Sequence, residues 1–447
     1  MPTLPASPQD LLDRVRSDLG AGRAPLPSPS RPVPLPARTD AAGLALGATA
    51  AASLAAAELA GARPVPLNAD AIAVAYSSEQ WLRIDDVQPT AFAPLSGFFR
   101  ARDRWVRTHG NYPHHAAVLR AVLGLGPDAG RDDTAAALLE HDAAEVSARV
   151  TARGGLCVPV LPEDRKVDAR LRQEPLLAVT PLGRSPARPL PAGPAEAPLR
   201  GIRVLDLTRV IAGPVGTRTL ALLGAEVLRI DPPRLPEIGM QHLDTGHGKR
   251  SALLDLATTA GRTRFDALLA TADVVALGYR AAALDGLGLS PAALAQRRPG
   301  IVVVRHSAWG DAQRRGFDSL VQAASGIARA ESPDGELPGA LPAQALDHTA
   351  GYLLATAAMT LLQRRAAEGG SWLAETSLRR IAAELLGRHR TQTPEPQASL
   401  PAPGAHTQSF DVDGVTVTTA APAVAYAGGP TRFAAPRPWG RDEPEWA

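Results

Sequence analysis

An alternation of short apolar strands with helices between residues 201 and 307 constrains this chain more than any other feature. Four segments rich in β-branched and other apolar residues, GIRVLDL, AEVLRID, DVVALGY and GIVVVRHS, begin at residues 201, 225, 273 and 300. Helical patterns lie between and after them, at 214–223, 260–271, 291–297, 318–329 and 347–365. Strands that alternate with helices at this spacing form parallel βαβ units. The sequence therefore predicts an α/β fold with a Rossmann-like parallel sheet flanked by helices.

The turn after the first strand excludes the most familiar use of such a sheet. It reads TRVIAGPVG at residues 208–216 and lacks the G-x-G-x-x-G pattern. Those glycines let a dinucleotide pyrophosphate approach the backbone. Their absence argues against a nicotinamide dehydrogenase and favours another ligand.

Three proline-rich segments, at 25–36, 186–198 and 391–403, punctuate the chain. An amphipathic helix is expected within residues 1–20, with Leu11, Leu12, Val15 and Leu19 on one face. One strand is expected at 412–419, around the Asp413-Gly414 pair.

The predicted domain organisation is an N-terminal helical and proline-rich segment (1–69), a small-domain-like and returning segment (70–185), a linker (186–198), a Rossmann-like domain (199–390) and a proline-rich C-terminal region (391–447).

Charge and cysteine content exclude several classes of function. The 47 basic and 45 acidic residues nearly cancel, so no overall field would recruit nucleic acid or an anionic membrane. Cys157 is the only cysteine, which rules out an intramolecular disulfide and a cysteine metal cluster, and its apolar surroundings predict a buried side chain. His114 and His115 lack a third ligand at helical spacing and read as a polar loop, so no metal site is expected.

The N-terminal region carries no pattern of a secreted or membrane protein. Acidic residues in the first 20 positions replace the apolar core of a signal peptide. Residues 41–62 are long enough to span a bilayer, but they are mostly Ala, Gly and Thr and include Glu58. A soluble alanine-rich helix and a cytoplasmic protein are expected.

Seven segments in the second half resemble, in order, those of the family III CoA-transferases, also called the CaiB/BaiF family. They lie at 199–233 (LRGIRVLDLTRVIAGPVGTRTLALLGAEVLRIDPP), 247–256 (HGKRSALLDL), 272–289 (ADVVALGYRAAALDGLGL), 299–310 (PGIVVVRHSAWG), 316–328 (GFDSLVQAASGIA), 345–362 (ALDHTAGYLLATAAMTLL) and 369–386 (GGSWLAETSLRRIAAELL). The resemblance implies a Rossmann-like domain with a smaller α+β domain, and a CoA-transferase activity with no tightly bound cofactor and with coenzyme A as a substrate.

The first half resembles the piece that normally comes last in this family. Residues 98–126 are similar to a second-domain hairpin followed by a helix, and 143–183 are similar to the segment that returns to the large domain. This order predicts a circular permutation, or a fusion with later truncation, which surface-placed termini tolerate. Members of the family are interlocked homodimers, so the resemblance also implies a homodimer.

Asp347 falls on the family's catalytic aspartate. The resemblance implies that this carboxylate attacks the acyl-CoA thioester to give a mixed anhydride, and that the thiolate returns to form an aspartyl-CoA thioester for an incoming carboxylic acid. A helix N-terminus favours the anion. The alternative interpretation of Asp347 is an ordinary N-cap. His348, the next residue, is expected on the helix surface.

The resemblance also implies a set of CoA-binding positions: Val210, Ile211, Ala212, Lys249, Arg250, Leu254, Tyr279, Arg280 and Arg315. For Lys249 and Arg250 the alternative is a solvated turn before a strand. Four positions depart from the family's pattern, because Pro232, Ala257, Gly278 and Gly286 replace polar or basic residues there. Residues 70–185 also lack the glycine-rich loop that shields the anhydride in many members. The altered positions predict weaker CoA binding unless other arginines substitute, and the missing loop argues against full transferase activity.

Two alternatives to the transferase function remain open. A 2-methylacyl-CoA racemase needs two acid–base groups on opposite sides of the α-carbon, but Phe317 stands where racemases have a histidine, and His306 reads as structural. The altered phosphate contacts and the reordered chain fit a non-catalytic CoA-binding or partner subunit. Acyl-CoA and carboxylic acid substrates are the partners that the transferase prediction requires.

Overall fold

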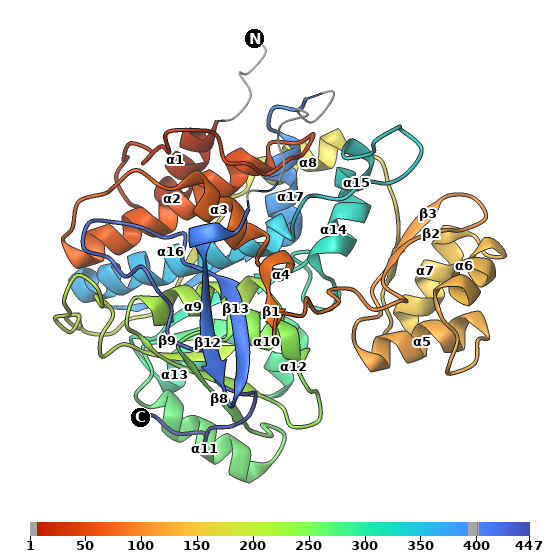
Figure 1. Cartoon of the computed structure of the whole chain (residues 1–447). Coiled ribbons are helices and arrows are strands. Elements are labelled where there is room, and N and C mark those ends of the chain that lie inside the picture. Colours follow the sequence, from red (N-terminus) through yellow and green to blue (C-terminus); the bar gives the residue numbers. More distant parts are fainter. Residues whose placement is uncertain (1–6, 392–399, 401) are drawn as a thin grey trace.

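The computed structural model describes residues 7–391, 400 and 402–447, and a seven-stranded sheet forms its centre (Figure 1). The strand order is β5-β11-β10-β9-β6-β7-β8. The strands are β5 (Ala178–Gly183), β6 (Arg203–Leu207), β7 (Glu226–Asp231), β8 (Lys249–Leu253), β9 (Val274–Leu277), β10 (Val302–Ser307) and β11 (Ser371–Ser377). All neighbours pair in parallel except β5, which runs antiparallel to β11 at the edge. The predicted α/β fold with a Rossmann-like sheet is confirmed.

Side chains of the central strands alternate between two apolar cores. Val204, Val274 and Val302 belong to one cluster of buried residues. Leu205 and Val275, each one position along its strand, belong to the other. This two-residue period places a core on each face of the sheet. The helices α11 (Thr259–Leu269) and α13 (Pro291–Arg297) cover the second face.

Two helices lie against the first face of the sheet, and a third packs on one of them. The helix α16 (Ala345–Glu368) packs against α9 (Ala212–Leu222) and against α2 (Ala41–Ala60), as Figure 1 shows. Close approach depends on glycine, because a Cβ atom at Gly351 would lie 2.7 Å from the carbonyl oxygen of Ala212. A Cβ at Gly216 would lie 2.9 Å from the carbonyl oxygen of Gly351. The α9–α16 crossing therefore fixes the start of α16, where Asp347 lies.

The α2 helix is long and apolar enough to cross a membrane by length and composition alone. In the folded chain, however, 78% of its most apolar window is buried inside the molecule. Its alanine side chains form part of the main core beside α16. Burial within the fold thus accounts for its composition.

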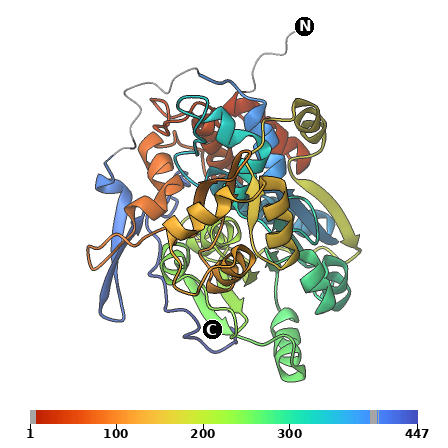
Figure 2. The ribbon, with the colours of Figure 1, turned by 90° about the vertical axis from the view of Figure 1, so that its right-hand side faces the viewer.

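A smaller unit at 97–159 packs around its own core at one side of the molecule (Figure 1) and lies in front in Figure 2. It contains the sheet β2-β3-β4, formed by β2 (Gly97–Arg100), β3 (Trp105–Thr108) and β4 (Cys157–Pro159). Its helices are α5 (Pro113–Leu123), α6 (Arg131–Leu139) and α7 (Ala143–Ala152). The predicted hairpin followed by a helix is confirmed, and Cys157 is buried as expected. The permutation and the domain limits stay predictions.

The C-terminal region differs from the expected single strand at 412–419. It forms a hairpin of β12 (Thr407–Val412) and β13 (Val415–Ala420), which β1 (Arg83–Ile84) extends. Asp413 and Gly414 have φ angles of 54° and 83°. Two consecutive positive φ values make a tight two-residue hairpin turn. The prediction was wrong because this pair lies between two strands and not within one.

The remaining elements connect these layers. They are α1 (Pro8–Asp18), α3 (Ala69–Tyr76), α4 (Ser78–Trp81), α8 (Arg165–Gln173), α10 (Gly239–Thr245), α12 (Ala281–Gly286), α14 (Asp318–Ser325), α15 (Ile327–Ala330), α17 (Leu378–Leu386) and the 3₁₀ turn Gly404–His406. The four leucine and valine side chains expected on one face of α1 are all buried. The helix expected at 318–329 is broken at Gly326, whose φ is 101°.

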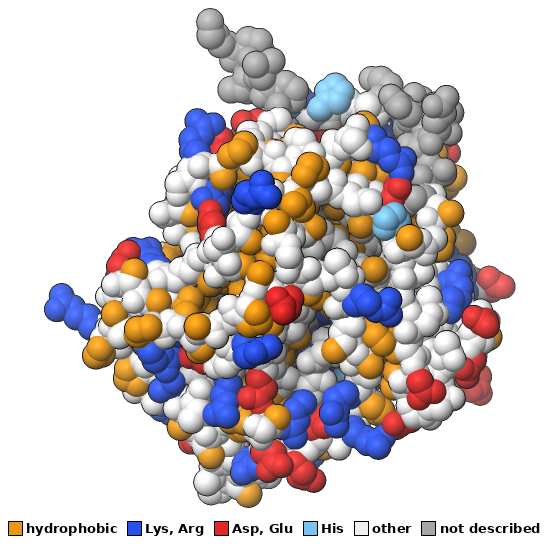
Figure 3. All heavy atoms as spheres, turned by 60° about the vertical axis from the view of Figure 1, so that its left-hand side comes forward, with side chains coloured by type: hydrophobic (Ala, Val, Ile, Leu, Met, Phe, Trp, Pro, Cys, Tyr) orange, Lys and Arg blue, Asp and Glu red, His pale blue; other side chains and the backbone are white. Residues whose placement is uncertain are grey.

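The surface matches the near-balanced charge. On the face drawn in Figure 3, basic and acidic side chains are interspersed among apolar ones.

Candidate functional site

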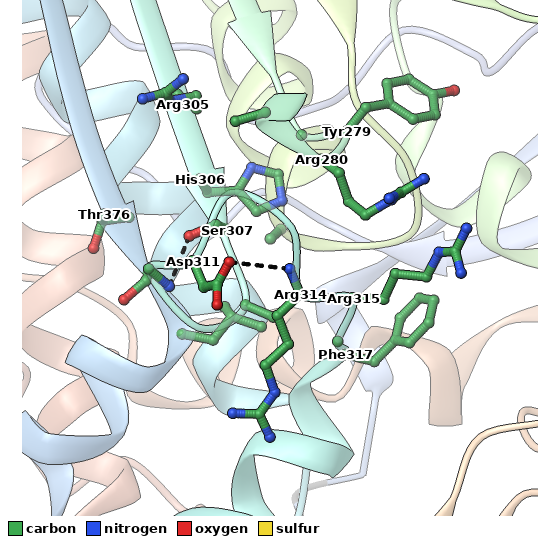
Figure 4. Close-up of a pocket in the computed structure, with 18 of the residues that line it drawn as sticks. Tyr279, Arg280, Arg305, His306, Ser307, Asp311, Arg314, Arg315, Phe317 and Thr376 are labelled. Atoms are coloured by element: carbon green, nitrogen blue, oxygen red, sulfur yellow. Dashed lines mark hydrogen bonds between the residues drawn. The ribbon is translucent and has the colours of Figure 1, made fainter. Parts of the chain in front are cut away.

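A cavity of about 590 Å³ opens at the carboxyl ends of the parallel strands. Its walls come from residues that follow β6, β9, β10 and β11, and from the smaller unit, which contributes Tyr112, His114 and His115. Open α/β sheets commonly bind ligands at this edge. Figure 4 shows part of the wall, with Arg280, Arg314 and Arg315 around the loop that follows β10.

The structure brings six of the ten predicted site residues to this cavity. Those that line it are Asp347, Val210, Ala212, Tyr279, Arg280 and Arg315. Ile211, Lys249, Arg250 and Leu254 do not line it. Val210 has a φ of 69°, which is unusual for a β-branched residue and marks a strained turn beside the cavity.

Lys249 lies inside the sheet and away from the cavity. Its Nζ is 3.0 Å from Asp206 Oδ2 and donates to Thr217 Oγ1 at 2.6 Å. Burial lowers the pKa of Lys249 to about 8, although the charge of Asp206 opposes the shift. The residue is buried and paired, so it neither lies in a solvated turn nor reaches a bound phosphate.

Arg250 and Leu254 also lie apart from the cavity. Arg250 Nη1 donates to the carbonyl oxygen of Glu445 at 2.9 Å, and its Nε is 3.8 Å from Asp442 Oδ1. The guanidinium therefore anchors the C-terminal segment beside β8. Leu254 packs against the second apolar core.

Asp347 lies in the first turn of α16 and is only 6% exposed. The N-cap of this helix is Gln344, so the alternative interpretation of Asp347 as an N-cap is wrong. Among the described residues, no group donates a hydrogen bond to its carboxylate. Burial, then the charges of Asp318 and Glu79, raise the pKa of Asp347 well above its usual value. The favourable helix N-terminus is thus outweighed by desolvation.

Asp318, which the sequence did not single out, is the acidic neighbour of Asp347. It is fully buried at the start of α14. Its Oδ2 accepts the backbone N–H of Asp347 at 3.0 Å, and its Oδ1 accepts Gln322 Nε2 at 2.6 Å. Burial raises the pKa of Asp318 to about 6. The two carboxyl groups disfavour each other's ionisation.

His348 is buried, and not on the helix surface as expected. Its ring lies 5.3 Å from that of Tyr76, and its Nε2 is 3.9 Å from Glu79 Oε2. The prediction was wrong because Tyr76 of α3 and Glu79 of α4 lie against this side of α16 and leave His348 no solvated face. His306 lines the cavity, and burial lowers its pKa to about 4, so its ring is neutral at pH 7.

Six arginines line the cavity: Arg209, Arg280, Arg305, Arg314, Arg315 and Arg380. Three of them pair with carboxylates, since Arg209 contacts Glu237, Arg305 contacts Glu375 and Arg380 contacts Glu384.

The other three, Arg280, Arg314 and Arg315, have no carboxylate within ion-pair distance among the described residues. Arg314 stacks 3.6 Å from the centre of the Trp309 ring, and Arg315 Nη1 donates to the carbonyl oxygen of Gly154 at 3.1 Å. Arg280 and Arg315 lie on the same side of the loop in Figure 4, and their charges repel. Three uncompensated guanidinium groups favour an anionic ligand.

No cluster of three metal-ligating side chains occurs in the part of the chain that the structure describes. The neighbouring histidines His114 and His115 begin α5 and line the cavity with Tyr112 and Phe317. They are therefore helical and not in a loop as expected. The cavity accordingly combines the buried carboxyl of Asp347, several aromatic rings and three arginines without a carboxylate partner among the described residues.

Comparisons with known proteins identify the family to which the chain belongs. Residues 199–427 match the sequence model of CoA-transferase family III. The chain is 30% identical over 242 residues to a probable fatty acyl-CoA transferase, Rv3272, of Mycobacterium tuberculosis, which covers 48% of this chain and 60% of that protein. It is 35% identical over 161 residues to the acetyl-CoA:oxalate CoA-transferase of Acetobacter aceti, with 32% and 41% covered.

Solved structures give similar partial matches. A CaiB/BaiF family protein from Brucella suis is 24% identical, with a TM-score of 0.40 and coverage of 49% of this chain and 65% of that chain. A crystal structure of Rv3272 matches at 31% identity with a TM-score of 0.39. The chain thus spans only about 60% or less of the curated relatives named above. Because the family model covers more than half of its residues, the chain belongs to the family III CoA-transferases.

Proposed function

We propose that this protein is an acyl-CoA:carboxylate CoA-transferase in which Asp347 is the nucleophile. The observation that carries the proposal is the state of the Asp347 carboxyl, which is buried, free of hydrogen bonds from the described residues and part of the cavity wall. An ion in such surroundings is poorly solvated, so its ionised form is a stronger nucleophile than a solvated carboxylate. Relatives named as CoA-transferases support the reaction class.

The reaction proceeds in two symmetrical halves. The Asp347 carboxylate attacks the thioester carbonyl, the C–S bond breaks, and CoA leaves as the thiolate from a mixed anhydride. The thiolate attacks the aspartyl carbonyl of that anhydride and releases the first acid as its carboxylate. An incoming carboxylate then attacks the aspartyl-CoA thioester, and the thiolate returns to the new acyl group and frees Asp347. No atom is left over and no oxidant is needed.

The arginines of the cavity are suited to the CoA phosphates. Arg280, Arg314 and Arg315 have no acidic partner, and a guanidinium binds phosphate through two parallel hydrogen bonds. Pro232, Ala257 and Gly286, the departures from the family's basic pattern, do not line the cavity among the described residues. Arg314, which does line it and has no carboxylate partner among the described residues, is the substitute that we assign.

Asp318 is a positioning residue in this scheme. It holds the first turn of α16 through the N–H of Asp347, and its charge adds to the raised pKa of the nucleophile. Phe317, which lines the cavity and stacks 3.9 Å from the ring of His109, has no proton to transfer. No contact among the described residues of the site favours racemisation over transfer.

Trapping of the acyl-enzyme tests the proposal. The full chain is incubated with acetyl-CoA, succinyl-CoA and a medium-chain acyl-CoA in turn, then quenched with hydroxylamine and digested. We expect a hydroxamate on the peptide that contains Asp347, because both the anhydride and the thioester react with this amine.

The matched controls are Asp347→Asn and Asp311→Asn. Asp311 is an exposed acid of the same cavity, and its replacement should leave the label in place. If no acyl-CoA donor labels the wild type or either variant, the result would support a non-catalytic CoA-binding subunit. The homodimer and the cytoplasmic location stay predictions, and light scattering on the purified chain checks the first.

A further inference from the structure

A second cavity, of about 470 Å³, lies between the smaller unit and the large one. It shares no lining residue with the first cavity among the described residues. Two arginines, Arg107 and Arg131, face it from β3 and α6, and Ser319 and Gln322 face it from α14. Phe92, Leu341 and Pro342 add apolar surface.

Arg107 is a buried cation with no carboxylate within ion-pair distance among the described residues. It is 8% exposed, its side chain makes no hydrogen bond with the described residues, and its Nε is buried without a partner. Its guanidinium lies 5.0 Å from the centre of the Phe92 ring and 4.9 Å from that of Phe98. Burial, reinforced by the charge of Arg131, lowers the pKa of Arg107 to about 10. Two aromatic faces offset only part of the cost of such burial, so this position favours an anionic ligand.

Arg131 supplies the second guanidinium. It stacks 4.6 Å from the centre of the Phe99 ring, and its Nη2 donates to the carbonyl oxygen of Phe98 at 3.3 Å. A Cβ atom at Gly97 would lie only 2.6 Å from Arg131 Nη1. The glycine therefore leaves the space in which this guanidinium lies against β2.

A hydroxyl completes the donor set. Ser319 is 6% exposed, and its Oγ is buried without a hydrogen-bond partner. The one acidic residue among the cavity's described lining is Glu79, which is not within ion-pair distance of either arginine and instead lies 3.9 Å from His348 Nε2. Two guanidinium groups and a hydroxyl, beside an apolar wall, match a carboxylate with a short apolar chain.

We propose that this second cavity is a binding site for a short-chain carboxylate, held by Arg107, Arg131 and Ser319. The site is separate from the cavity where CoA is proposed to bind, so its existence does not depend on the transferase activity.

Binding of a carboxylate in the second cavity would affect the ionisation of Asp347 through Gln322 and Asp318. This step rests on the proposed function. Gln322 lines the second cavity and donates to Asp318 Oδ1. Arg107 and Asp318 attract each other electrostatically, so the free arginine favours ionised Asp318. A bound anion neutralises Arg107 and disfavours ionisation of the two aspartates. A carboxylic acid that accumulates would thereby slow its own formation.

Calorimetric titration of the full chain with sodium butyrate, without any CoA ester, tests the site. We expect saturable binding, weakened about ten-fold in Arg131→Met and in Ser319→Ala, as expected for loss of one charge-assisted or buried hydrogen bond. The matched control is Arg104→Met, an exposed arginine of the same unit that pairs with its neighbour Asp103. Arg280→Met, in the first cavity, should also leave butyrate affinity unchanged.

Absence of saturable binding would overturn the proposal. So would unchanged affinity in both Arg131→Met and Ser319→Ala, or binding that Arg280→Met abolishes, since the ligand would then occupy the first cavity. Tight binding of inorganic phosphate with none of butyrate would show that the ligand class is wrong. Failure to label Asp347 while butyrate binds as expected would refute the transferase and leave this site intact.

Discussion

The two carboxyl groups at the start of α14 and α16 work against the stability of the fold. Both Asp318 and Asp347 are buried, and both have raised pKa values. Each carboxyl binds its proton more tightly in the folded chain than in the unfolded chain. The fold therefore loses stability as pH rises from the unfolded-state pKa of the group to its folded-state pKa. A nucleophile kept poorly solvated for reactivity therefore lowers the free energy of unfolding at neutral pH.

Replacement of Asp347 by asparagine should make the protein more stable at pH 7.5. The amide needs no ionisation, so the penalty that grows from about pH 3.8 upward disappears. We expect a melting temperature a few degrees above wild type at pH 7.5 and no difference near pH 4, with activity lost at both. Differential scanning calorimetry across this range measures it. A variant less stable than wild type at pH 7.5 would contradict a desolvated carboxyl at this position.

Asp318→Asn should show whether Asp318 positions Asp347 and raises its pKa without itself being required for the chemical step. The amide oxygen can still accept the backbone N–H of Asp347, but the neighbouring charge is gone. The pKa of Asp347 should fall, which moves the acid limb of the pH profile of kcat to lower pH. The hydroxamate label on Asp347 should persist. Loss of the label, or a pH profile that does not move, would show that Asp318 acts in another way.

At the scale of elements, the sequence predicted the strands that their own apolar pattern identifies. It predicted poorly those that depend on a partner strand. The strands β6, β7, β9 and β10 were predictable because runs such as Val302-Val303-Val304 are apolar on both faces, as a central parallel strand requires. The hairpin β12–β13 was half missed, since TQSFDV shows little of this pattern and depends on its partner.

The site was predictable only where a resemblance pointed to it. Asp347 stood out because it matches a motif, and Arg280 and Arg315 followed in the same way. Asp318 and Arg107 could not be found from the sequence, because each is significant only beside groups far along the chain. The burial of Lys249 was equally hidden, since its partner Asp206 lies 43 residues away.

The α9–α16 crossing offers a test at this scale. Gly351→Ala would place a Cβ 2.7 Å from both the carbonyl oxygen of Ala212 and the side chain of Val215. We expect a loss of about 1–3 kcal/mol in unfolding free energy, as for other overpacked cores. Gly239→Ala is the matched control, because its Cβ would meet nothing within 4 Å. Urea unfolding of the two variants compares them, and equal stability would mean that the helices do not approach as closely as described.

At the scale of the whole molecule, the cavity joins the two units of the chain. Arg315, on the loop after β10, donates to Gly154 of the smaller unit, and Tyr112 of that unit donates to Glu237 of the large one at 2.5 Å. Neither unit encloses the cavity alone. Binding of CoA should therefore depend on residues near this junction more than on the far edge of the sheet.

The family resemblance assigns both Arg315 and Arg250 to CoA binding. Replacing each in turn tests whether CoA binds near the junction or at the edge of the sheet. Arg315 lines the cavity, whereas Arg250 lies at β8 and holds the C-terminal segment. Arg315→Met should weaken CoA binding about ten-fold through loss of a charge-assisted contact to phosphate. Arg250→Gln should leave CoA affinity unchanged and lower the melting temperature slightly. Calorimetric titration with CoA and with dephospho-CoA compares the variants, and a smaller penalty for Arg315→Met with dephospho-CoA would assign this arginine to the 3′-phosphate. Equal loss of affinity in Arg250→Gln would instead place the nucleotide along β8, outside the cavity that contains Asp347.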